Sequence, residues 1–372
     1  MALTGIASLE IIAGTAALFL LLIFLVRTAR DIIPYVYSTA RIRAKESKLI
    51  QGDKLEDLIT ANSLTEVFSY LEATEYARYM QNLVLTGSEA VERALLNQMA
   101  DTYVEVAAMV PKNVRSTFAV LARVWDVRNI KTILRGIQGG LPPDDIKAHL
   151  LPVGELDQKK LYDMAEANTV ADVVSALEET RYAALMEALP RYDESGNMFH
   201  FDTALDRIHW DETWATVEPT NVVPLKRYLA ICVDTTNLKI LLRAKKEGLS
   251  LDAIQNSLIT GGTILNKALR GFEDADIPTM VLAFEGTEYY SILSDAVPEY
   301  ERIGTLIGME NALDRYMITT GRDISIKQPF GIGPLIGFIA QKEAELRNVR
   351  AIARGKEAGL GVDEIRSTVI SI

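Results

Sequence analysis

Apolar residues recur every three or four positions through most of the chain, and the stretch 120–137 shows this pattern clearly. Such spacing gives a helix one buried face, so it predicts amphipathic α-helices. Alternation of apolar and polar residues bounded by turn pairs, which would predict strands, is scarce. The pattern therefore predicts an all-α fold.

Short signals predict where these helices begin and end. Gly140 follows the stretch 120–137, and a glycine there can adopt the left-handed backbone that ends a helix. Ser250, two residues after Gly248, is a favourable N-cap for a second helix. A helix that ends at such a glycine and is followed by a second helix forms a hairpin, which we predict for each repeated Gly-Leu pair. Two further helix starts have the spacing of a capping box: Ser63 with Glu66, and Thr169 with Asp172. Loops are predicted at 142–143, 219–224 and 326–337.

Three sequence elements recur three times in a fixed order. The first is Leu-Glu-x-Thr-x-Tyr or a close variant, at 71–76, 177–182 and 284–289. The second is acid-x-Ala-Leu, at 92–95, 202–205 and 310–313. The third is an asparagine followed by a base, an arginine and Gly-Leu: Asn129, Lys131, Arg135 and Gly140-Leu141; Asn237, Lys239, Arg243 and Gly248-Leu249; Asn348, Arg350, Arg354 and Gly359-Leu360. Repeats this long predict a few copies of one helical domain.

A partial fourth copy lies near the start of the chain. Arg43 and Leu49 keep the spacing of the arginine and the leucine, while Tyr37 stands where the other copies have asparagine. We expect this half unit to let the beginning of the chain complete a domain. The predicted divisions are an N-terminal membrane segment at 1–30, a partial repeat at 31–60, and helical repeats at 61–150, 151–259 and 260–372.

The recurring asparagines imply buried hydrogen bonds. Asparagine disfavours a helix interior, so its presence three times on a packed helix requires polar partners. An acid also precedes each asparagine by three residues, at Asp126, Asp234 and Glu345. We interpret the repeated residues as a polar network that fixes how the hairpins meet, with a ligand site as the alternative. Its predicted members are Asn129, Asn237, Asn348, Arg43, Arg135, Arg243 and Arg354.

The first residues are far more apolar than the rest. Between residues 6 and 26 the only charged residue is Glu10, and six bases follow between 27 and 48 against two acids. This predicts a membrane helix with the remainder of the chain in the cytoplasm. A cleaved signal peptide is the alternative, although the uncharged first residues do not fit one. Glu10 is interpreted as an interfacial residue, with a functional intramembrane carboxylate as the alternative.

Composition narrows the class of function. The chain has 372 residues and a net charge of −11, which argues against a nucleic-acid partner. Cys232 is the only cysteine, so no disulfide framework exists, and we expect it to be a small buried residue.

No catalytic or metal constellation can be assembled from the sequence. The glycines at 331–337 lack the lysine and hydroxyl of a phosphate-binding loop. The three histidines have no metal-ligand spacing. We therefore expect no catalytic residue, no cofactor, no metal and no small-molecule substrate, and an enzyme with an unrecognised site is the least favoured function.

Four stretches carry a resemblance to a known family. They are residues 35–49, 234–249, 342–350 and 355–360, and the likeness extends over roughly 34–372. The chain resembles the C subunit of archaeal A-type and bacterial V-type ATP synthases, which is related to the d subunit of vacuolar ATPases.

The resemblance implies three helical domains arranged as a pseudo-threefold funnel. Such a subunit sits on the proteolipid ring of the membrane sector, receives the central shaft in its cavity and transmits torque without an active site. The apolar N-terminal segment departs from the soluble pattern of bacterial members, and we expect it to enter the ring's lumen or its lipid plug.

Charge suggests how such a funnel is seated. Arg41, Arg43 and Lys45 would face anionic headgroups or acidic loops of the ring, and the acidic remainder would face a basic shaft. The alternative function is a membrane-tethered helical-repeat adaptor or scaffold protein.

Overall fold

The computed structural model describes residues 2–81, 87–111, 115–272 and 276–370, without the side chains of 2–14, 28, 30, 31, 116–118, 121 and 256. Over these residues the secondary structure consists of helices and contains no strand, which confirms the all-α prediction.

The helices fall into three consecutive series. The first series is α1 (Ala2–Glu46), α2 (Asp53–Thr60), α3 (Leu64–Glu72), α4 (Ala77–Met80) and α5 (Gly87–Met109). The second is α6 (Arg115–Ala122), α7 (Val124–Gln138), α8 (Pro143–Ala148), α9 (Gln158–Ala165), α10 (Val170–Ser175), the 3₁₀ helix η2 (Ala183–Ala188), α11 (Leu189–Ser195) and α12 (Phe199–Val217). The third is α13 (Val223–Lys246), α14 (Leu251–Ile254), the 3₁₀ helix η3 (Gln255–Ser257), α15 (Leu265–Phe272), α16 (Ile277–Leu282), α17 (Glu288–Ser294), α18 (Val297–Ile303) and α19 (Ile307–Lys327), followed by α20 (Gly333–Glu357) and α21 (Val362–Thr368).

Three hydrophobic cores define three packed units. The first unit is built on α7–α12, with a core from Val127 to Ile208. The second unit is built on α13–α19, with a core from Val233 to Leu313. The third core joins α2–α5 to α20 and α21, so it contains both Leu95 and Ile352. We call this last group the closing unit, because residues from both ends of the chain make it.

These cores divide the chain differently from the predicted ranges 61–150, 151–259 and 260–372. Each unit begins with the asparagine helix and continues through the Tyr and Ala-Leu elements, whereas each predicted range ended with the hairpin that contains the asparagine helix. The reason is packing: the apolar face of α7 is covered by the helices after it, α9, α10 and α12. The segment 31–60 contributes Ile42, Leu49, Leu55 and Leu58 to the core of the closing unit, so the beginning of the chain completes that unit.

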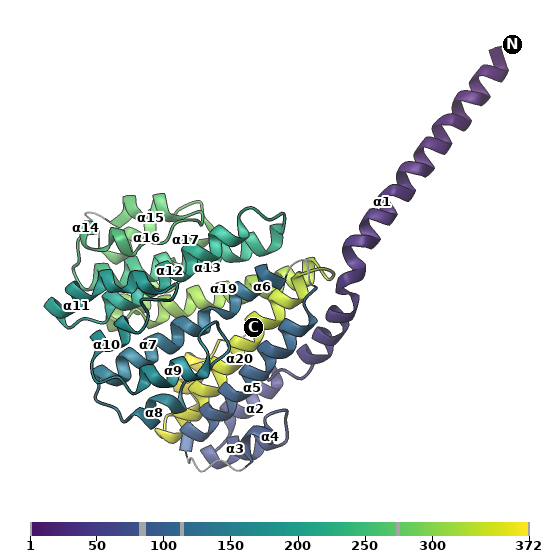
Figure 1. Ribbon diagram of the computed structural model, residues 1–372. Helices are drawn as coiled ribbons and strands as arrows, with labels where there is room; N and C mark the ends of the chain where they lie inside the picture. Colours follow the sequence, from purple (N-terminus) through teal and green to yellow (C-terminus); the bar gives the residue numbers. More distant parts are fainter. Residues whose placement is uncertain (1, 82–86, 112–114, 273–275, 371–372) are drawn as a thin grey trace.

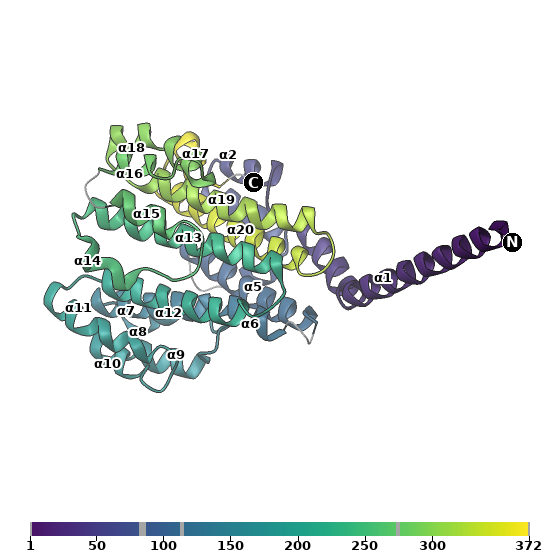
Figure 2. The same ribbon diagram turned by 90° about the horizontal axis from the view of Figure 1, so that it is seen from above.

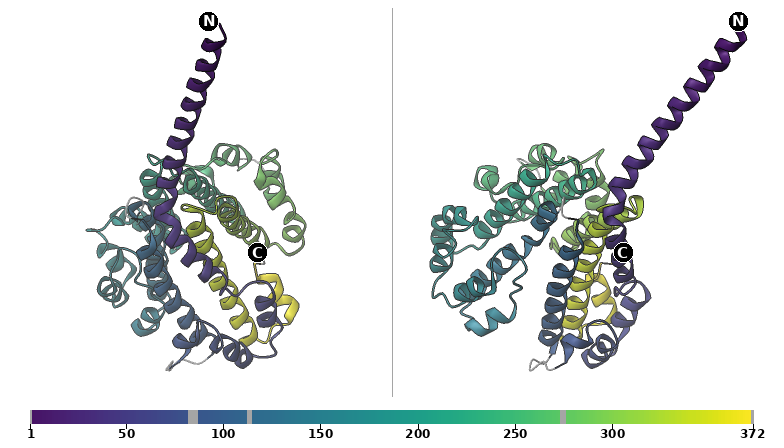
Figure 3. Two further views of the ribbon diagram at one scale, coloured as in Figure 1. Left: turned by 90° about the vertical axis from the view of Figure 1, so that its right-hand side faces the viewer. Right: turned by 45° about the vertical axis from the view of Figure 1, so that its right-hand side comes forward.

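The long helices form a closed circuit. Along it, α5 contacts α6, α6 contacts α12, α12 contacts α13, α13 contacts α19, α19 contacts α20, and α20 returns to α5. Figure 2 shows α12, α13, α19 and α20 side by side, and Figure 3 shows α20 beside α5. The circuit is closed by contacts between the two ends of the chain.

One end of this circuit is filled by a shared apolar cluster. It takes Val217 from α12, Leu229 from α13, Ile324 from α19 and Ile336 from α20, and Tyr35 of α1 packs against it. Cys232 is buried in this cluster, as expected, and burial raises the pKa of its thiol. The helices α7, α13 and α20 all start near this end and run away from α1 (Figure 1).

Helix α1 leaves the body as a single projecting helix (Figure 1, Figure 3). Its last turns contact α5 and α20, whereas the side chains of Leu18–Val26 are about half exposed or more. Over the described residues, no helix combines the length and apolarity needed to cross a bilayer. The side chain of Glu10 lies outside the described residues.

The predicted helix ends agree with the structure in most places. Gly140, Gly248 and Gly359 have φ values of 68°, 69° and 71°, so each supplies the expected left-handed residue. The predicted loop 326–337 is too long, because α20 already begins at Gly333. Gly337 allows α20 to lie against α19, since a Cβ there would sit 2.4 Å from the Cβ of Ser325.

Candidate functional site

Each recurring asparagine holds the backbone of a residue 22 positions later. The side-chain Nδ2 donates to that residue's carbonyl, and Oδ1 accepts from its N–H. The pairs are Asn129 with Leu151 at 2.7 and 2.8 Å, Asn237 with Ile259 at 2.9 and 2.9 Å, and Asn348 with Ile370 at 2.8 and 2.8 Å. We call these contacts the asparagine clamps. All three asparagines are buried, so each clamp satisfies one backbone N–H and one backbone carbonyl in the interior.

The acid three residues earlier makes a second set of contacts. Asp126 accepts from the N–H groups of Glu155 and Leu156 and from the Tyr182 hydroxyl at 3.2 Å. Burial raises the pKa of Asp126, and these donors oppose the shift. In the second unit, Asp234 accepts from Thr263, Ile264 and Tyr289 in the same way.

In the closing unit, partners for this acid come from the opposite end of the chain. Glu345 accepts from the N–H of Ile50 at 3.2 Å and from the hydroxyl of Tyr76. Lys342 also pairs with Glu345 at 2.8 Å, and both side chains are almost fully buried. The tyrosine of the first repeated element therefore contacts the acid of the asparagine helix in all three units.

The asparagine clamps and the contacts of the acids together show which residues are equivalent in the three units. Leu156 follows Leu151 by five residues, and Ile264 follows Ile259 by five. In the closing unit the corresponding residues are Ile370 and Ile50, so the unit runs from the C-terminus into the segment after α1.

The bases of the asparagine helices pair with the Ala-Leu helices. Four bases have one acid each: Lys131 with Asp206 at 2.6 Å, Arg135 with Asp202 at 2.6 Å, Lys239 with Asp314, and Arg243 with Glu310 at 2.6 Å. In the closing unit Arg350 and Arg354 share Glu92, at 3.1 and 2.6 Å. Leu96 stands where the other units have Asp206 and Asp314.

Two adjoining cavities lie between the units. The larger, about 580 Å³, is lined by α5, α7 and α20, and includes Leu96, Lys131 and Arg354. The other, about 420 Å³, adds Tyr228 of α13 and Asp314 of α19. Both are lined by Trp125, Arg128 and Arg350, so we treat them as one central cavity.

The lining of the central cavity is rich in bases, although the whole chain is acidic. The expectation that the acidic remainder faces a basic shaft stays a prediction. The repeated bases of α7 and α20 line the cavity: Lys131, Arg135, Arg350 and Arg354. Lys239 and Arg243 of α13 are not among the lining residues. His209, buried next to the cavity, is neutral: burial, then Arg123, Arg128 and Lys131, lower its pKa to about 3.

The proposed ring-contact bases have three different environments. Arg41 is exposed and donates to the Tyr37 hydroxyl at 2.8 Å. Arg43 pairs with Glu46 at 2.7 Å and donates to the carbonyl of Ser325, so it does not join Arg135 and Arg354 in the cavity. Lys45 pairs with Glu105 of α5. Arg43 therefore fastens α1 to α19.

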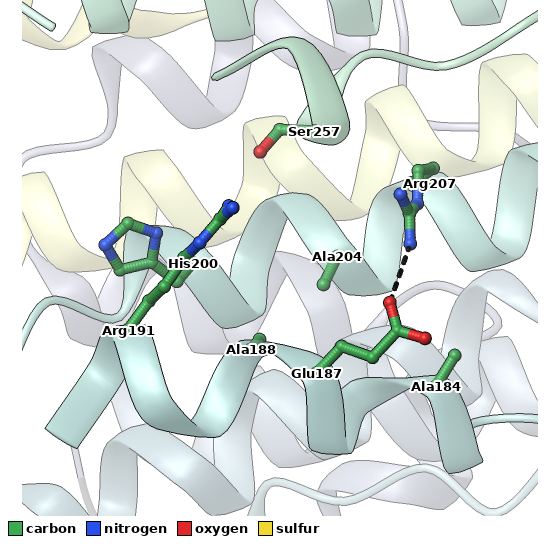
Figure 4. Close-up of a pocket in the computed structure, with 8 residues that line it drawn as sticks. All are labelled: Ala184, Glu187, Ala188, Arg191, His200, Ala204, Arg207 and Ser257. Atoms are coloured by element: carbon green, nitrogen blue, oxygen red, sulfur yellow. Dashed lines mark ion pairs between the residues drawn. The ribbon is translucent and has the colours of Figure 1, made fainter. Parts of the chain in front are cut away.

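A smaller hollow of about 210 Å³ lies between the first unit and η3 of the second (Figure 4). Arg191, His200 and Arg207 line it, and Glu187 pairs with Arg207 at 3.9 Å. Burial and the nearby Arg191 lower the pKa of His200. In the part of the chain that the structure describes, no cluster of His, Cys, Asp and Glu could hold a metal ion.

Sequence reasoning missed the acid partners of the cavity bases. The acid-x-Ala-Leu element had singled out Glu92, Asp202 and Glu310, but no partner was assigned to them. The signal was present: a second acid follows four residues later in two copies, at Asp206 and Asp314, which places both acids on one helix face.

Comparisons with known proteins agree with one another. A family model described as the ATP synthase (C/AC39) subunit matches residues 38–368. The chain is 34% identical to the C subunit of the A-type ATP synthase of Methanocaldococcus jannaschii, over 94% of this chain and 90% of that protein. It is 34% identical to the C subunit of the A-type enzyme of Methanobrevibacter smithii, over 92% and 90%, and 28% identical to that of Pyrococcus abyssi, over 90% and 90%.

The asparagine clamps predict a large effect on stability. Asn237→Ala leaves the N–H and the carbonyl of Ile259 buried without partners, so we expect the free energy of unfolding to fall by about 2–4 kcal/mol. Urea denaturation followed by circular dichroism measures this. The neighbouring Thr236→Ala, which removes a hydroxyl bonded only within its own helix, is the matched control and should cost less than about 1 kcal/mol. Equal stability of the two variants would refute the role of the clamp.

The register predicts that a circular permutant will fold. Deleting residues 1–47 and joining Ile372 directly to Lys48 leaves the same number of residues between Ile370 and Ile50 as between Leu151 and Leu156. Opening this chain in the loop before α13 should retain the helicity of residues 48–370 and a cooperative unfolding transition, at a lower stability because the core loses Ile42. A second permutant with four residues removed at the joint is the control, because it cannot satisfy both contacts. If the permutant with four residues removed is the more stable of the two, the proposed register of the closing unit is wrong.

Proposed function

Because the chain belongs to the ATP synthase C/AC39 subunit family, we propose that it is the rotor subunit that links the membrane proteolipid ring to the central shaft of a rotary ATP synthase. In this role it transmits torque between ion translocation and ATP synthesis or hydrolysis. It contributes no active site of its own.

The observation that carries the proposal is the circuit of helices around the central cavity. The circuit is filled with apolar side chains at the α1 end and carries a polar, base-lined cavity farther along. In the proposed funnel of three pseudo-equivalent units, the open side of this cavity receives the end of the central shaft. The apolar side, near α1, rests on the proteolipid ring. Torque transmission requires a rigid socket, and the buried clamps in all three units supply such rigidity.

Helix α1 supports a further part of the proposal, the attachment to the ring. Its exposed apolar side chains from Leu18 to Val26 would be costly in water, and its projection leaves them available to lipid or to the ring's interior. We propose that this segment inserts there and that the body lies on the cytoplasmic face of the cell membrane. Membrane lipids, the ring and the shaft subunits are then its partners.

Removing the apolar segment should release the protein from the ring. We expect the variant lacking residues 1–30 to dissociate from purified proteolipid rings in about 1 M NaCl, where the Debye length is about 3 Å and charge contacts are screened. Sedimentation with the rings measures retention of the full chain and of the variant. A matched variant with serine at Leu18, Leu21, Leu22 and Leu25 retains the helix length and should behave like the deletion. Undiminished retention of both variants would rule out the anchor.

Arg41 is better suited than Arg43 to test whether charge holds the chain on the ring, because Arg43 already contacts Glu46 and Ser325 within the fold. Arg41→Glu exchanges a favourable charge for an unfavourable one, so we expect ring binding at low salt to weaken by about 2 kcal/mol, at about 1 kcal/mol per charge. The effect should vanish in high salt. Lys159→Glu, on the exposed side of α9, is the control and should leave binding unchanged. Equal effects of the two substitutions would exclude a specific seat at Arg41.

A further inference from the structure

We propose that three arginines of α20, Arg347, Arg350 and Arg354, bind carboxylates on the central shaft and fix the angle at which the shaft enters the cavity. We call these residues the α20 arginine row. The inference rests on the function proposed above and adds to it the residues and the chemistry of the shaft contact.

The row is one of three related rows that differ in charge balance. On α7, Arg128, Lys131 and Arg135 occupy the equivalent positions, and each has its own acid. On α13, the row contains Lys239 and Arg243, again with one acid each.

The α20 row has fewer acids than bases. Arg350 and Arg354 share Glu92, and Arg347 pairs with Asp314, which already holds Lys239. The cause is visible in the sequence, because Leu96 replaces the second acid of the Ala-Leu helix. Counted by ion pairs, the excess of bases over acids therefore falls on the α20 row, while the remaining α20 acid, Glu343, pairs with Arg128 of α7.

The row is also placed to meet a partner. Arg347 and Arg350 line the smaller part of the central cavity, and Arg350 and Arg354 line the larger part. The side chain of Arg354 is 59% exposed, so it can rearrange toward an incoming carboxylate. Arg350 is more enclosed: burial lowers its pKa, Glu92 opposes the shift, and Arg354 and Arg128 add to it. A further anion would relieve this crowding of positive charge.

A symmetric socket would accept a shaft in three nearly equivalent orientations. Charge complementarity between partners suppresses the wrong orientations, because it favours only those that bring opposite charges together. Carboxylates on one side of the shaft would find arginines that share their acid partners only at α20, where they also gain bidentate contacts with the guanidinium groups. The imbalance thus gives the socket a single preferred angle.

Matched substitutions at the three equivalent arginines test the inference. The full chain and its variants Arg135→Gln, Arg243→Gln and Arg354→Gln are titrated with the purified central-shaft subunit of the same ATP synthase at low salt. We expect Arg354→Gln to weaken binding by about tenfold, and the other two by less than about threefold. Leu96→Asp, which restores the missing acid, should weaken binding like Arg354→Gln, provided that its unfolding transition shows a folded protein.

A photo-cross-linker at Thr132, which lines the cavity, reads out the angle directly. It should mark one segment of the shaft with the wild-type chain and additional segments with Arg354→Gln. Equal weakening by all three glutamine variants, or an unchanged cross-link pattern, would overturn the inference while leaving the socket function standing. A wild-type chain that binds rings but not the shaft would refute both.

Discussion

The fold depends on pairing the buried peptide groups that follow each asparagine helix. Where the chain leaves such a helix through a glycine turn and crosses the core, its N–H and carbonyl groups lose water and need protein partners. The asparagine clamps at Leu151, Ile259 and Ile370 provide them, and the acid three residues earlier serves the next segment. Because the partner lies 22 residues away each time, the same side chain fixes the same geometry in three units.

Satisfying this geometry in the closing unit requires both ends of the chain. The clamp of Asn348 is made with Ile370, whereas the acid Glu345 has to reach Ile50 and Tyr76. The same requirement places α20 against α5 and so closes the circuit of long helices. The central cavity is a consequence of that closure, since inward-facing Lys and Arg side chains with acid partners hold the walls without filling the middle with apolar groups.

The sequence allowed the helical class, the left-handed glycines and the repeated positions to be predicted, because each depends on residues close together in the chain. It did not allow the division into units to be predicted. A repeat has no preferred starting point, and only the packing of α7 against later helices shows that the asparagine helix begins a unit. Arg43 was grouped with Arg135 for its spacing, yet it bonds to Glu46 and Ser325, because α1 precedes the point where the repeat resumes. The cavity partners Asp206 and Asp314 were overlooked because their periodicity appears in only two copies.

The departures from threefold symmetry are concentrated on α20 and have a common physical origin. This helix is the long element that packs on both the first and the last parts of the chain, so its neighbours come from α1 and α5 as well as from α19. A glutamate replaces the aspartate of the other units at Glu345, and the buried Lys342 pairs with it. A buried ion pair of this kind adds little stability but strongly disfavours arrangements that separate it. On its cavity side the same helix carries more bases than it has acids for. Helix α20, which packs against both ends of the chain, is therefore also the helix that makes the charge of the cavity asymmetric.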